Sequence, residues 1–268
     1  PSGGSDLAAL KTNAVRDGDE WVINGSKTFI TNGYSADLVL VAARTAPEKK
    51  ARGITLFAVE ATRDGFSRGR KLDKVGQEES DTAELFFADV RVPDENIVGQ
   101  LDEGFIHMMT WLPQERLGSA VTNLAHCRQI LVETIDYTKE RKAFGQSVGS
   151  FQHNKFLIAD LVTRVEVAQA YLDQCVLAHM EGELTATDAA KAKWWSAQVQ
   201  NEVLDHCLQL HGGYGFMNEY RVGRAWRDAR VTKISARPPA TPQALTGRPP
   251  GLQPHPRTLP PPPANPAA

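Results

Sequence analysis

Residues 112–117 read Leu-Pro-Gln-Glu-Arg-Leu, so a carboxylate and a guanidinium closely follow a proline. Proline is tolerated in the first helical turn because its missing N–H would be unpaired there, so Pro113 places Glu115 near a helix start or a proline kink. The carboxylate is either a charge that complements the helix dipole or a base at a reaction centre. Short motifs often match by chance, and these six residues alone favour the dipole interpretation.

Two further segments carry polar groups at turns. Residues 1–6, Pro-Ser-Gly-Gly-Ser-Asp, offer N–H and hydroxyl donors that could wrap a phosphate, although a plain connecting turn explains them equally well. Residues 141–145, Arg-Lys-Ala-Phe-Gly, form a basic turn between two helical patterns. Taken alone, that turn is a solvated helix terminus whose cations complement the dipole.

Composition excludes several classes of protein. The chain has 268 residues, 41% of them hydrophobic, and a net charge of −2, which fits two globular domains and does not indicate nucleic-acid binding. Apolar runs stay below the roughly 20 residues of a membrane span. Cys127, Cys175 and Cys207 lack metal-ligand spacing, so we expect no metal site and three buried thiols in a reducing compartment.

The first hundred residues have a strand-like pattern. Asn24-Gly25 lies between extended runs and predicts a hairpin, and Asn32-Gly33 predicts another turn. The short apolar runs are residues 10–15, 21–23, 27–31, 38–42, 54–59 and 83–92. Their spacing predicts an antiparallel β-barrel or sandwich domain over residues 1–100.

From residue 103 to residue 234 the apolar period is helical. Three long stripes end at Ile135, Leu172 and Leu208, Gly212-Gly213 stops the third helix, and a shorter helix is predicted over residues 222–234. Short connections favour an antiparallel α-helical bundle over residues 103–234. The predicted fold class is therefore α+β, with two domains.

The end of the chain has a different composition. Residues 236–268 hold twelve of the sixteen prolines and no acidic or aromatic residue. Such a segment buries too little apolar surface to offset its ordering entropy. We therefore expect a disordered tail over residues 235–268, which is also the composition of sequence translated out of frame.

Residues 1–234 resemble the acyl-CoA dehydrogenases, the flavin-dependent enzymes that oxidise acyl-CoA thioesters. The resemblance rests on several motifs in the family's order: residues 1–6, 28–32 (Thr-Phe-Ile-Thr-Asn), 81–92, 112–117, 141–145 and 209–213 (Gln-Leu-His-Gly-Gly). Residues 112–117 resemble the long-chain and isovaleryl branches, which carry the catalytic glutamate on the first helix of the C-terminal domain. Other members carry it after a stretch like residues 228–230. The family's N-terminal helical domain and usual C-terminus have no counterpart here, so we expect a partial chain.

The resemblance implies a role for each motif residue. Glu115 would be the catalytic base. The implied contacts to acyl-CoA are Ser5, Pro113, Gln114, Glu115 and Arg116. The implied contacts to FAD are Ser5, Phe29, Ile30, Thr31, Arg141, Gln152, Gln209, Leu210, His211, Gly212 and Gly213. Residues from Arg141 onward would reach the ADP half of FAD across a subunit boundary, and arginine suits bidentate phosphate binding.

The implied reaction has a physical logic. A carboxylate near the substrate's Cα removes a proton, donors on the thioester oxygen stabilise the developing enolate, and the flavin accepts the hydride from Cβ. The product is the trans-2-enoyl-CoA. We expect Glu115 to work in a dry pocket.

The resemblance also implies partners and leaves alternatives open. The partners would be acyl-CoA, an electron-transfer flavoprotein and further copies of the chain, as a homotetramer or homodimer, in a bacterial cytoplasm or the mitochondrial matrix. One alternative is an acyl-CoA oxidase-like flavoenzyme that passes electrons to oxygen. Another is a truncated, non-catalytic remnant, which reading the coding DNA in its other frames after residue 234 would test.

Overall fold

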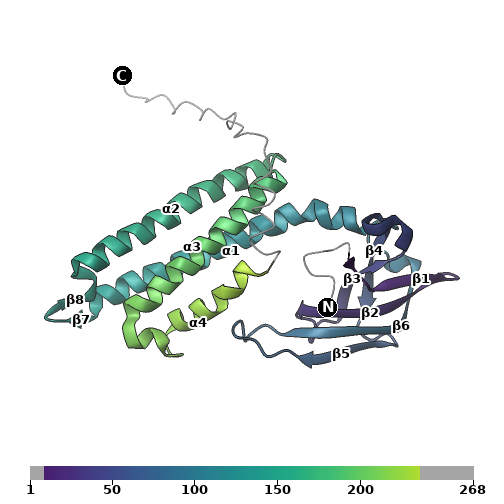
Figure 1. Ribbon diagram of the computed structural model, residues 1–268, viewed down its shortest axis with the longest axis horizontal. Helices are drawn as coiled ribbons and strands as arrows, with labels where there is room; N and C mark the ends of the chain where they lie inside the picture. Colours follow the sequence, from purple (N-terminus) through teal and green to yellow (C-terminus); the bar gives the residue numbers. More distant parts are fainter. Residues whose placement is uncertain (1–8, 236–268) are drawn as a thin grey trace, which may run out of the picture.

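The computed structural model describes residues 9–235, in which a β-sheet part precedes a helical part (Figure 1). This confirms the predicted α+β class with a sheet domain and a helical domain. Residues 1–6, with Ser5, lie outside the described residues. So does the tail predicted from residue 235, apart from Ser235 itself.

The sheet has six strands in the order β4-β3-β1-β2-β6-β5. Their bounds are β1 Asn13–Asp17, β2 Glu20–Thr31, β3 Leu38–Arg44, β4 Ile54–Glu60, β5 Phe66–Lys71 and β6 Thr82–Pro93. All pairs are antiparallel except β1 and β3, which pair in parallel through Asn13 and Arg44. The predicted antiparallel barrel or sandwich is therefore wrong in this respect: the strands form one open, mixed sheet.

Alternation along the strands builds the core of the sheet. Trp21 and Ile23 of β2 are buried, and so are Leu85 and Phe87 of β6, while the residues between them are more exposed. This period of two places one apolar side of each strand in a shared cluster. Phe57 of β4 completes the cluster, with its ring centroid 5.7 Å from that of Trp21.

The hairpin predicted at Asn24-Gly25 is wrong, because β2 continues through both residues. Asn24 instead exchanges side-chain hydrogen bonds with Asp89 of β6, donating to its Oδ1 and accepting from its N–H, both at 2.9 Å. The register shifts between Ile23 and Gly25, and Gly25 has φ +143°, so the pair forms a bulge. The two-residue turn lies earlier, between the paired residues Asp17 and Glu20.

The helical part consists of four helices in the described chain. Their bounds are α1 Gly104–Glu140, α2 Gln152–Met180, α3 Ala186–His211 and α4 Arg221–Ala229. Between α1 and α2 lie the two-stranded ribbon β7 Lys142–Ala143 and β8 Gln146–Ser147 and the turn η4 Val148–Ser150. Thr185 caps α3 by accepting from the N–H of Asp188 at 3.0 Å. Gly212 follows the last residue of α3 and has φ +60°, so the predicted helix stop at Gly212-Gly213 is confirmed.

Pro113 does not open a helix. α1 is 37 residues long and begins at Gly104, so Pro113 lies inside it. Of the two predicted positions, a helix start and a site within a helix, the structure has the second. Because proline has no N–H, the carbonyl of Met109 receives no helical hydrogen bond from this position.

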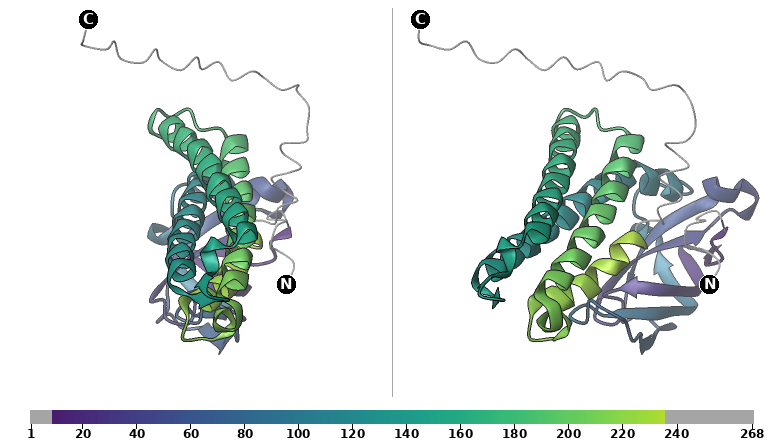
Figure 2. Two further views of the ribbon diagram at one scale, coloured as in Figure 1. Left: turned by 90° about the vertical axis from the view of Figure 1, so that its left-hand side faces the viewer. Right: turned by 60° about the vertical axis from the view of Figure 1, so that its left-hand side comes forward.

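The three long helices pack through an apolar cluster that includes Leu124 and Cys127 of α1, Leu161 of α2 and Leu204 of α3. α4 lies on the side of the bundle that faces the sheet (Figures 1 and 2). The sheet reaches the helices at two places. The turns η2 Pro47–Gly53 and η3 Asp94–Asn96 flank the segment that leads into α1, and the loop between β5 and β6 contacts α4.

The last short turns are η5 Gly212–Phe216 and η6 Arg230–Lys233, so the helix predicted over residues 222–234 ends earlier, at Ala229. Within residues 9–235, no helix combines the length and apolar character needed to cross a membrane.

Candidate functional site

The predicted base lies on the exposed side of α1. Glu115 is exposed, so this single chain does not enclose it in the dry pocket that the sequence analysis expected. Its carbonyl accepts a hydrogen bond of 3.0 Å from Oγ of Ser119. Pro113 is half-buried and Gln114 is exposed.

Arg116 has a different environment from its neighbour Glu115. Successive helical residues point about 100° apart, and the Arg116 side chain enters the bundle, where the residue is 2% exposed. It lies close enough to Lys193 of α3 that burial and, secondarily, the Arg116 charge lower the pKa of that lysine. The role of Arg116 as an acyl-CoA contact stays a prediction.

The segment predicted to face the flavin ring carries an exposed aromatic side chain on strained backbone. Phe29 is 78% exposed and has φ +60°, an uncommon conformation for a bulky residue. The pairing register between β2 and β6 shifts between Lys27 and Ile30, and such a bulge re-aims a side chain. Ile30 packs against the sheet core and Thr31 is exposed. Strain of this kind is typical of functional positions.

The residues predicted to bind the ADP half of FAD meet at the other end of α1, near β7 and β8 (Figure 1). They line a cavity of about 600 Å³. Its lining residues are Tyr137, Arg141, Val148, Gln209, Leu210, His211, Gly212, Gly213, Tyr214 and Met217. The structure thus brings together Arg141 and residues 209–213, which two separate motifs supply. Gln152, the first residue of α2, is exposed and does not line this cavity.

Arg141 supplies a cation to this cavity. Its guanidinium carbon lies 5.6 Å from the ring centroid of Tyr214, and within residues 9–235 it forms no salt bridge. A Cβ added at Gly212 or Gly213 would meet no atom within 4 Å, so this backbone borders open space. An arginine beside open glycine backbone is suited to a phosphate group.

His211 supports the cavity and is not positioned as an acid or base. Its Nδ1 lies 2.8 Å from the carbonyl of Cys207, and because a carbonyl only accepts, Nδ1 carries the proton. Burial lowers the pKa of His211, which keeps the ring neutral at pH 7. The ring stacks on Tyr137 at 4.2 Å, and Oη of Tyr137 donates to the His211 carbonyl at 3.3 Å. His211 is the last residue of α3, so its ring supports the helix end, and its role as an FAD contact stays a prediction.

Sequence reasoning missed the aromatic residues of this cavity, namely Tyr137 and Tyr214, which line it, and Tyr220, which packs against both of them. Tyr137 lies four residues before Arg141, which places both on the same face of a helix. This four-residue spacing is the feature of the sequence from which Tyr137 could have been predicted to lie beside Arg141. The contributions of Tyr214 and Tyr220 depend on the path of the chain after Gly213.

The chemistry of these residues fits the FAD that the resemblance implies. Arg141 and the open backbone at Gly212 and Gly213 match its phosphates, and the exposed ring of Phe29 offers an apolar surface for a planar ring system. These two sets lie in different parts of the chain, because Phe29 is on β2 of the sheet and Arg141 is at the end of α1 away from the sheet (Figure 1). Along α1, the distance from Glu115 to the C-cap residue Arg141 is about 39 Å. In residues 9–235, no group of three or more His, Cys, Asp or Glu side chains is placed to hold a metal ion.

Family models match both parts of the chain. The model of the acyl-CoA dehydrogenase middle domain matches residues 1–90. The model of the acyl-CoA dehydrogenase C-terminal domain matches residues 102–236. Together they cover most of the described sheet and all of the described helices.

Similar proteins carry related names. The long-chain specific acyl-CoA dehydrogenase of Mus musculus mitochondria is 46% identical over 236 residues, which are 87% of this chain and 55% of the relative. Subunit CarC of the caffeyl-CoA reductase-Etf complex from Acetobacterium woodii is 37% identical over 87% of this chain and 62% of the relative. The chain therefore spans little more than half the length of these curated relatives.

Solved structures show the same architecture. An acyl-CoA dehydrogenase from Geobacillus kaustophilus superposes with a TM-score of 0.89 at 42% sequence identity. The superposition covers 91% of this chain and 65% of that one. The sheet, the helices and their relative placement are thus shared with that protein.

Proposed function

Since the chain belongs to the acyl-CoA dehydrogenase family, we propose that it forms the sheet and bundle domains of an FAD-dependent enzyme that converts an acyl-CoA to its trans-2-enoyl-CoA. The observation that carries this proposal is Glu115. It is an exposed carboxylate on α1, in the stretch that the long-chain and isovaleryl branches use for their base. The similarity to a long-chain relative favours that branch.

Each residue has a task in this reaction. Glu115 takes the proton from Cα of the thioester, and losing such a positioned base typically slows a reaction by about 10²–10⁴-fold. Pro113 and Gln114 lie beside Glu115 and border the acyl-CoA. Phe29, Ile30 and Thr31 border the flavin ring, and Phe29 excludes water there. FAD, when bound, supplies the acceptor for the hydride from Cβ.

The proposal includes a second copy of the chain. Arg141 and residues 209–213 bind the ADP half of an FAD, with Gln152 nearby. Because about 39 Å of helix separates Arg141 from Glu115, one extended dinucleotide does not reach both in the same chain. We therefore assign Arg141 to the FAD that serves Glu115 of another copy, in a homodimer or homotetramer.

The electron acceptor in this proposal is an electron-transfer flavoprotein. The Acetobacterium woodii relative is named as a subunit of a complex with such a protein. The competing assignment is an oxidase-like enzyme that reduces oxygen.

The proposal is tested with the FAD-loaded protein and a panel of isovaleryl-, butyryl- and palmitoyl-CoA. We expect oxidation of at least one thioester with a dye acceptor without air, and little hydrogen peroxide when air replaces the dye. Peroxide formation as fast as dye reduction would favour the oxidase. No oxidation of any thioester by protein that has bound FAD would refute both.

A further inference from the structure

A short segment joins the sheet to the helix that carries Glu115. It follows η3 and is fixed along β4 by backbone contacts. The N–H of Val98 donates to the carbonyl of Leu56 at 2.9 Å, and Glu103 forms an isolated bridge with Ile54. A Cβ added at Gly104, the first residue of α1, would lie 2.9 Å from the Ile54 carbonyl oxygen. Helix and sheet therefore touch directly where α1 begins.

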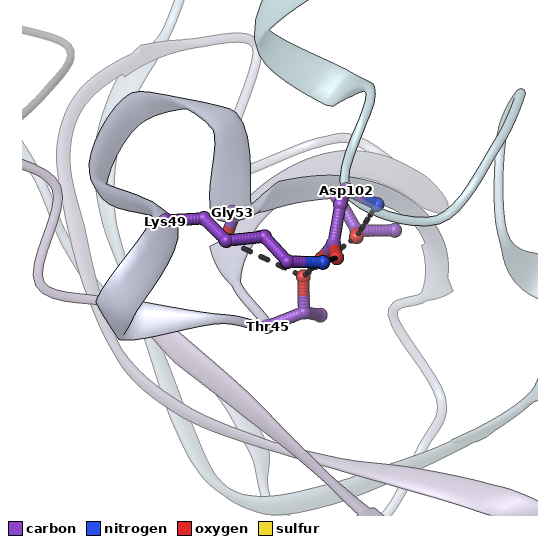
Figure 3. A network of polar contacts seen from close by, with 5 residues as sticks. Thr45, Lys49, Gly53 and Asp102 are labelled. Atoms are coloured by element: carbon purple, nitrogen blue, oxygen red, sulfur yellow. Dashed lines mark hydrogen bonds and ion pairs between the residues drawn. The ribbon is translucent and has the colours of Figure 1, made fainter.

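Four side chains close this junction, and we call them the Asp102 lock: Thr45, Lys49, Thr55 and Asp102. Asp102 lies two residues before α1, and the others lie on β4 or on the connection from β3 to β4. Figure 3 shows Thr45 and Lys49 directed at the Asp102 carboxylate. The lock thus ties the residue two positions before α1 to the sheet through side chains as well as backbone.

The hydrogen bonds of the lock have one consistent direction. The Asp102 N–H donates to Oγ1 of Thr55 at 2.8 Å, and Oγ1 of Thr45 donates to Oδ1 of Asp102 at 2.6 Å. The two threonine oxygens are 2.8 Å apart, and since the Thr45 proton goes to the carboxylate, Thr55 is the donor between them. The result is a closed ring through Asp102, Thr55 and Thr45, and Lys49 Nζ contacts the carboxylate from outside the ring, 2.6 Å from Oδ2.

The residue type at position 102 suits the ring and its backbone. Asp102 has φ +66°, a conformation that favours glycine, asparagine and aspartate. Burial raises the pKa of its carboxyl, but hydrogen bonds from Lys49 and Thr45 outweigh this, so the pKa lies below its ordinary value. The carboxylate is therefore ionised at neutral pH, and both of its oxygens accept the hydrogen bonds from Thr45 and Lys49.

The direction of α1 decides where Glu115 lies. Glu115 is about 16 Å along α1 from Gly104, so a tilt of about 4° at the junction moves it by about 1 Å. Phe29 and Thr31 belong to β2 and move with the sheet. A misplacement of about 1 Å in a reacting group can cost roughly 100-fold in rate.

A second contact joins the sheet part to the helical part independently of the lock. The N–H of Gln77, in the loop between β5 and β6, donates to Oδ1 of Asp228 of α4 at 2.6 Å. Arg227 pairs with Glu78 at 3.0 Å. Loss of the lock is therefore expected to loosen the angle of α1 and leave the protein folded.

We propose that the Asp102 lock sets the angle at which α1 leaves the sheet, and that Asp102 and Thr45 are positioning residues for Glu115. The claim about the angle of α1 concerns the chain itself. The claim that Asp102 and Thr45 affect turnover by positioning Glu115 rests on the proposed dehydrogenase function.

The test uses Thr45→Val, which keeps the shape of the side chain and removes the hydroxyl, and Asp102→Asn, which tolerates the positive φ and loses the charge paired with Lys49. Thr45→Ser restores the hydroxyl. Asp94→Asn is the matched control, because the Asp94 carboxylate accepts from Trp21 and Arg16 and is not bonded to any of the four residues of the lock.

The first readout is a distance. Val15 of β1 and Thr122 of α1 are exposed and the native cysteines are buried, so Val15→Cys and Thr122→Cys accept spin labels selectively. Double electron–electron resonance should give a narrow distribution of label-to-label distances in the wild-type background and with Thr45→Ser or Asp94→Asn. It should broaden or shift with Thr45→Val and with Asp102→Asn. If both of these variants gave distributions as narrow as the wild type and centred on the same distance, the proposal would be overturned.

The second readout is kinetic, on the full chain loaded with FAD. We expect kcat for acyl-CoA oxidation to fall about 10- to 100-fold with Thr45→Val while KM stays close to that of the wild type. Thr45→Ser should recover kcat. If the wild-type chain bound FAD and oxidised no thioester, the proposed function would fail, and the label distances would still decide the geometry. Unchanged kcat together with a broadened distribution would overturn the positioning role.

Discussion

Arg141 closes the helix that carries Glu115, so one rigid element holds the proposed base and the proposed phosphate ligand about 39 Å apart. The spacing is fixed by covalent geometry and by the packing of α1 in the bundle. It follows that a mutation of Glu115 should affect proton removal and a mutation of Arg141 should affect FAD binding. A chain with one mutation should also complement a chain with the other.

Glu115→Gln should keep FAD bound and lose acyl-CoA oxidation by about 10²–10⁴-fold, because the amide has the shape of the carboxylate and does not take a proton. The measurement is dye reduction by the FAD-loaded protein. Glu140→Gln, at the last residue of the same helix, is the control. Near-normal turnover of Glu115→Gln would place the base elsewhere.

Arg141→Ala should weaken FAD binding more than it slows the reaction of protein that still holds FAD. A charge-assisted contact to a phosphate contributes about 1.5–3 kcal/mol, which corresponds to roughly 10- to 100-fold in Kd. Flavin fluorescence on dilution measures the loss. Lys142→Ala removes the neighbouring exposed cation and should have little effect, and equal FAD retention by both variants would contradict the assignment.

At an FAD concentration that leaves Arg141→Ala largely without FAD, hybrids of Glu115→Gln and Arg141→Ala chains should be more active than either variant alone. If each site takes Glu115 from one copy and Arg141 from another, a hybrid dimer contains one site with both native residues. Co-expression with two affinity tags isolates the hybrid. Purified hybrids no more active than the better parent would exclude a shared site.

Lys27→Met should stabilise the protein at neutral pH. Burial lowers the pKa of Lys27 to about 8 from 10.5, although its Nζ donates to the Ala42 carbonyl at 2.7 Å. Below pH 8 the folded state therefore holds a disfavoured charge, and this cost disappears as the pH rises from about 8 to 10.5, where both states become neutral. In urea unfolding, the free energy of unfolding of Lys27→Met should exceed that of the wild type, and the difference should shrink as the pH rises over that range. Lys139→Met, at an exposed side chain, should show no such trend.

The three native thiols should not react with a thiol reagent at pH 8 until the protein unfolds. Cys127 and Cys207 are 0% exposed, and burial raises their pKa values to about 12 and about 11. Burial also raises the pKa of the Cys175 thiol. The thiolate is the nucleophile, so native protein offers almost none. Thr122→Cys provides an exposed positive control, and rapid reaction of unmodified native protein would contradict the expectation.

Periodicity was sufficient to predict the long helices. Apolar stripes ending at Ile135, Leu172 and Leu208 fall in α1, α2 and α3, and Gly212 ends α3 through its positive φ. The rule that Asn-Gly marks a hairpin failed at Asn24-Gly25, because tertiary hydrogen bonds to Asp89 favoured a bulge. β5 was missed because Phe-Ser-Arg-Gly-Arg-Lys has no β-branched residue and little alternation.

The candidate site was predictable only where its residues form a local motif. Arg141 and Gly212 each belong to a short pattern, and the structure brings them together at one cavity. Thr45 and Asp102 are 57 residues apart, and neither is part of a pattern, so their contact depends on the fold of the sheet. The exposure of Glu115 in one chain could not be inferred from its type, since burial depends on which other surfaces cover α1.

The two outer strands of the open sheet are each protected against pairing with another chain. Along β4, Val98 already donates to the Leu56 carbonyl, Asn96 to the Ala58 carbonyl, and Phe57 bridges Ile97, so few backbone groups remain for an incoming strand. β5 carries Arg68, Arg70 and Lys71, and such charges discourage edge-to-edge association. Copies of this chain should therefore associate through their helices, and the protein should resist the strand-by-strand growth that leads to fibrils.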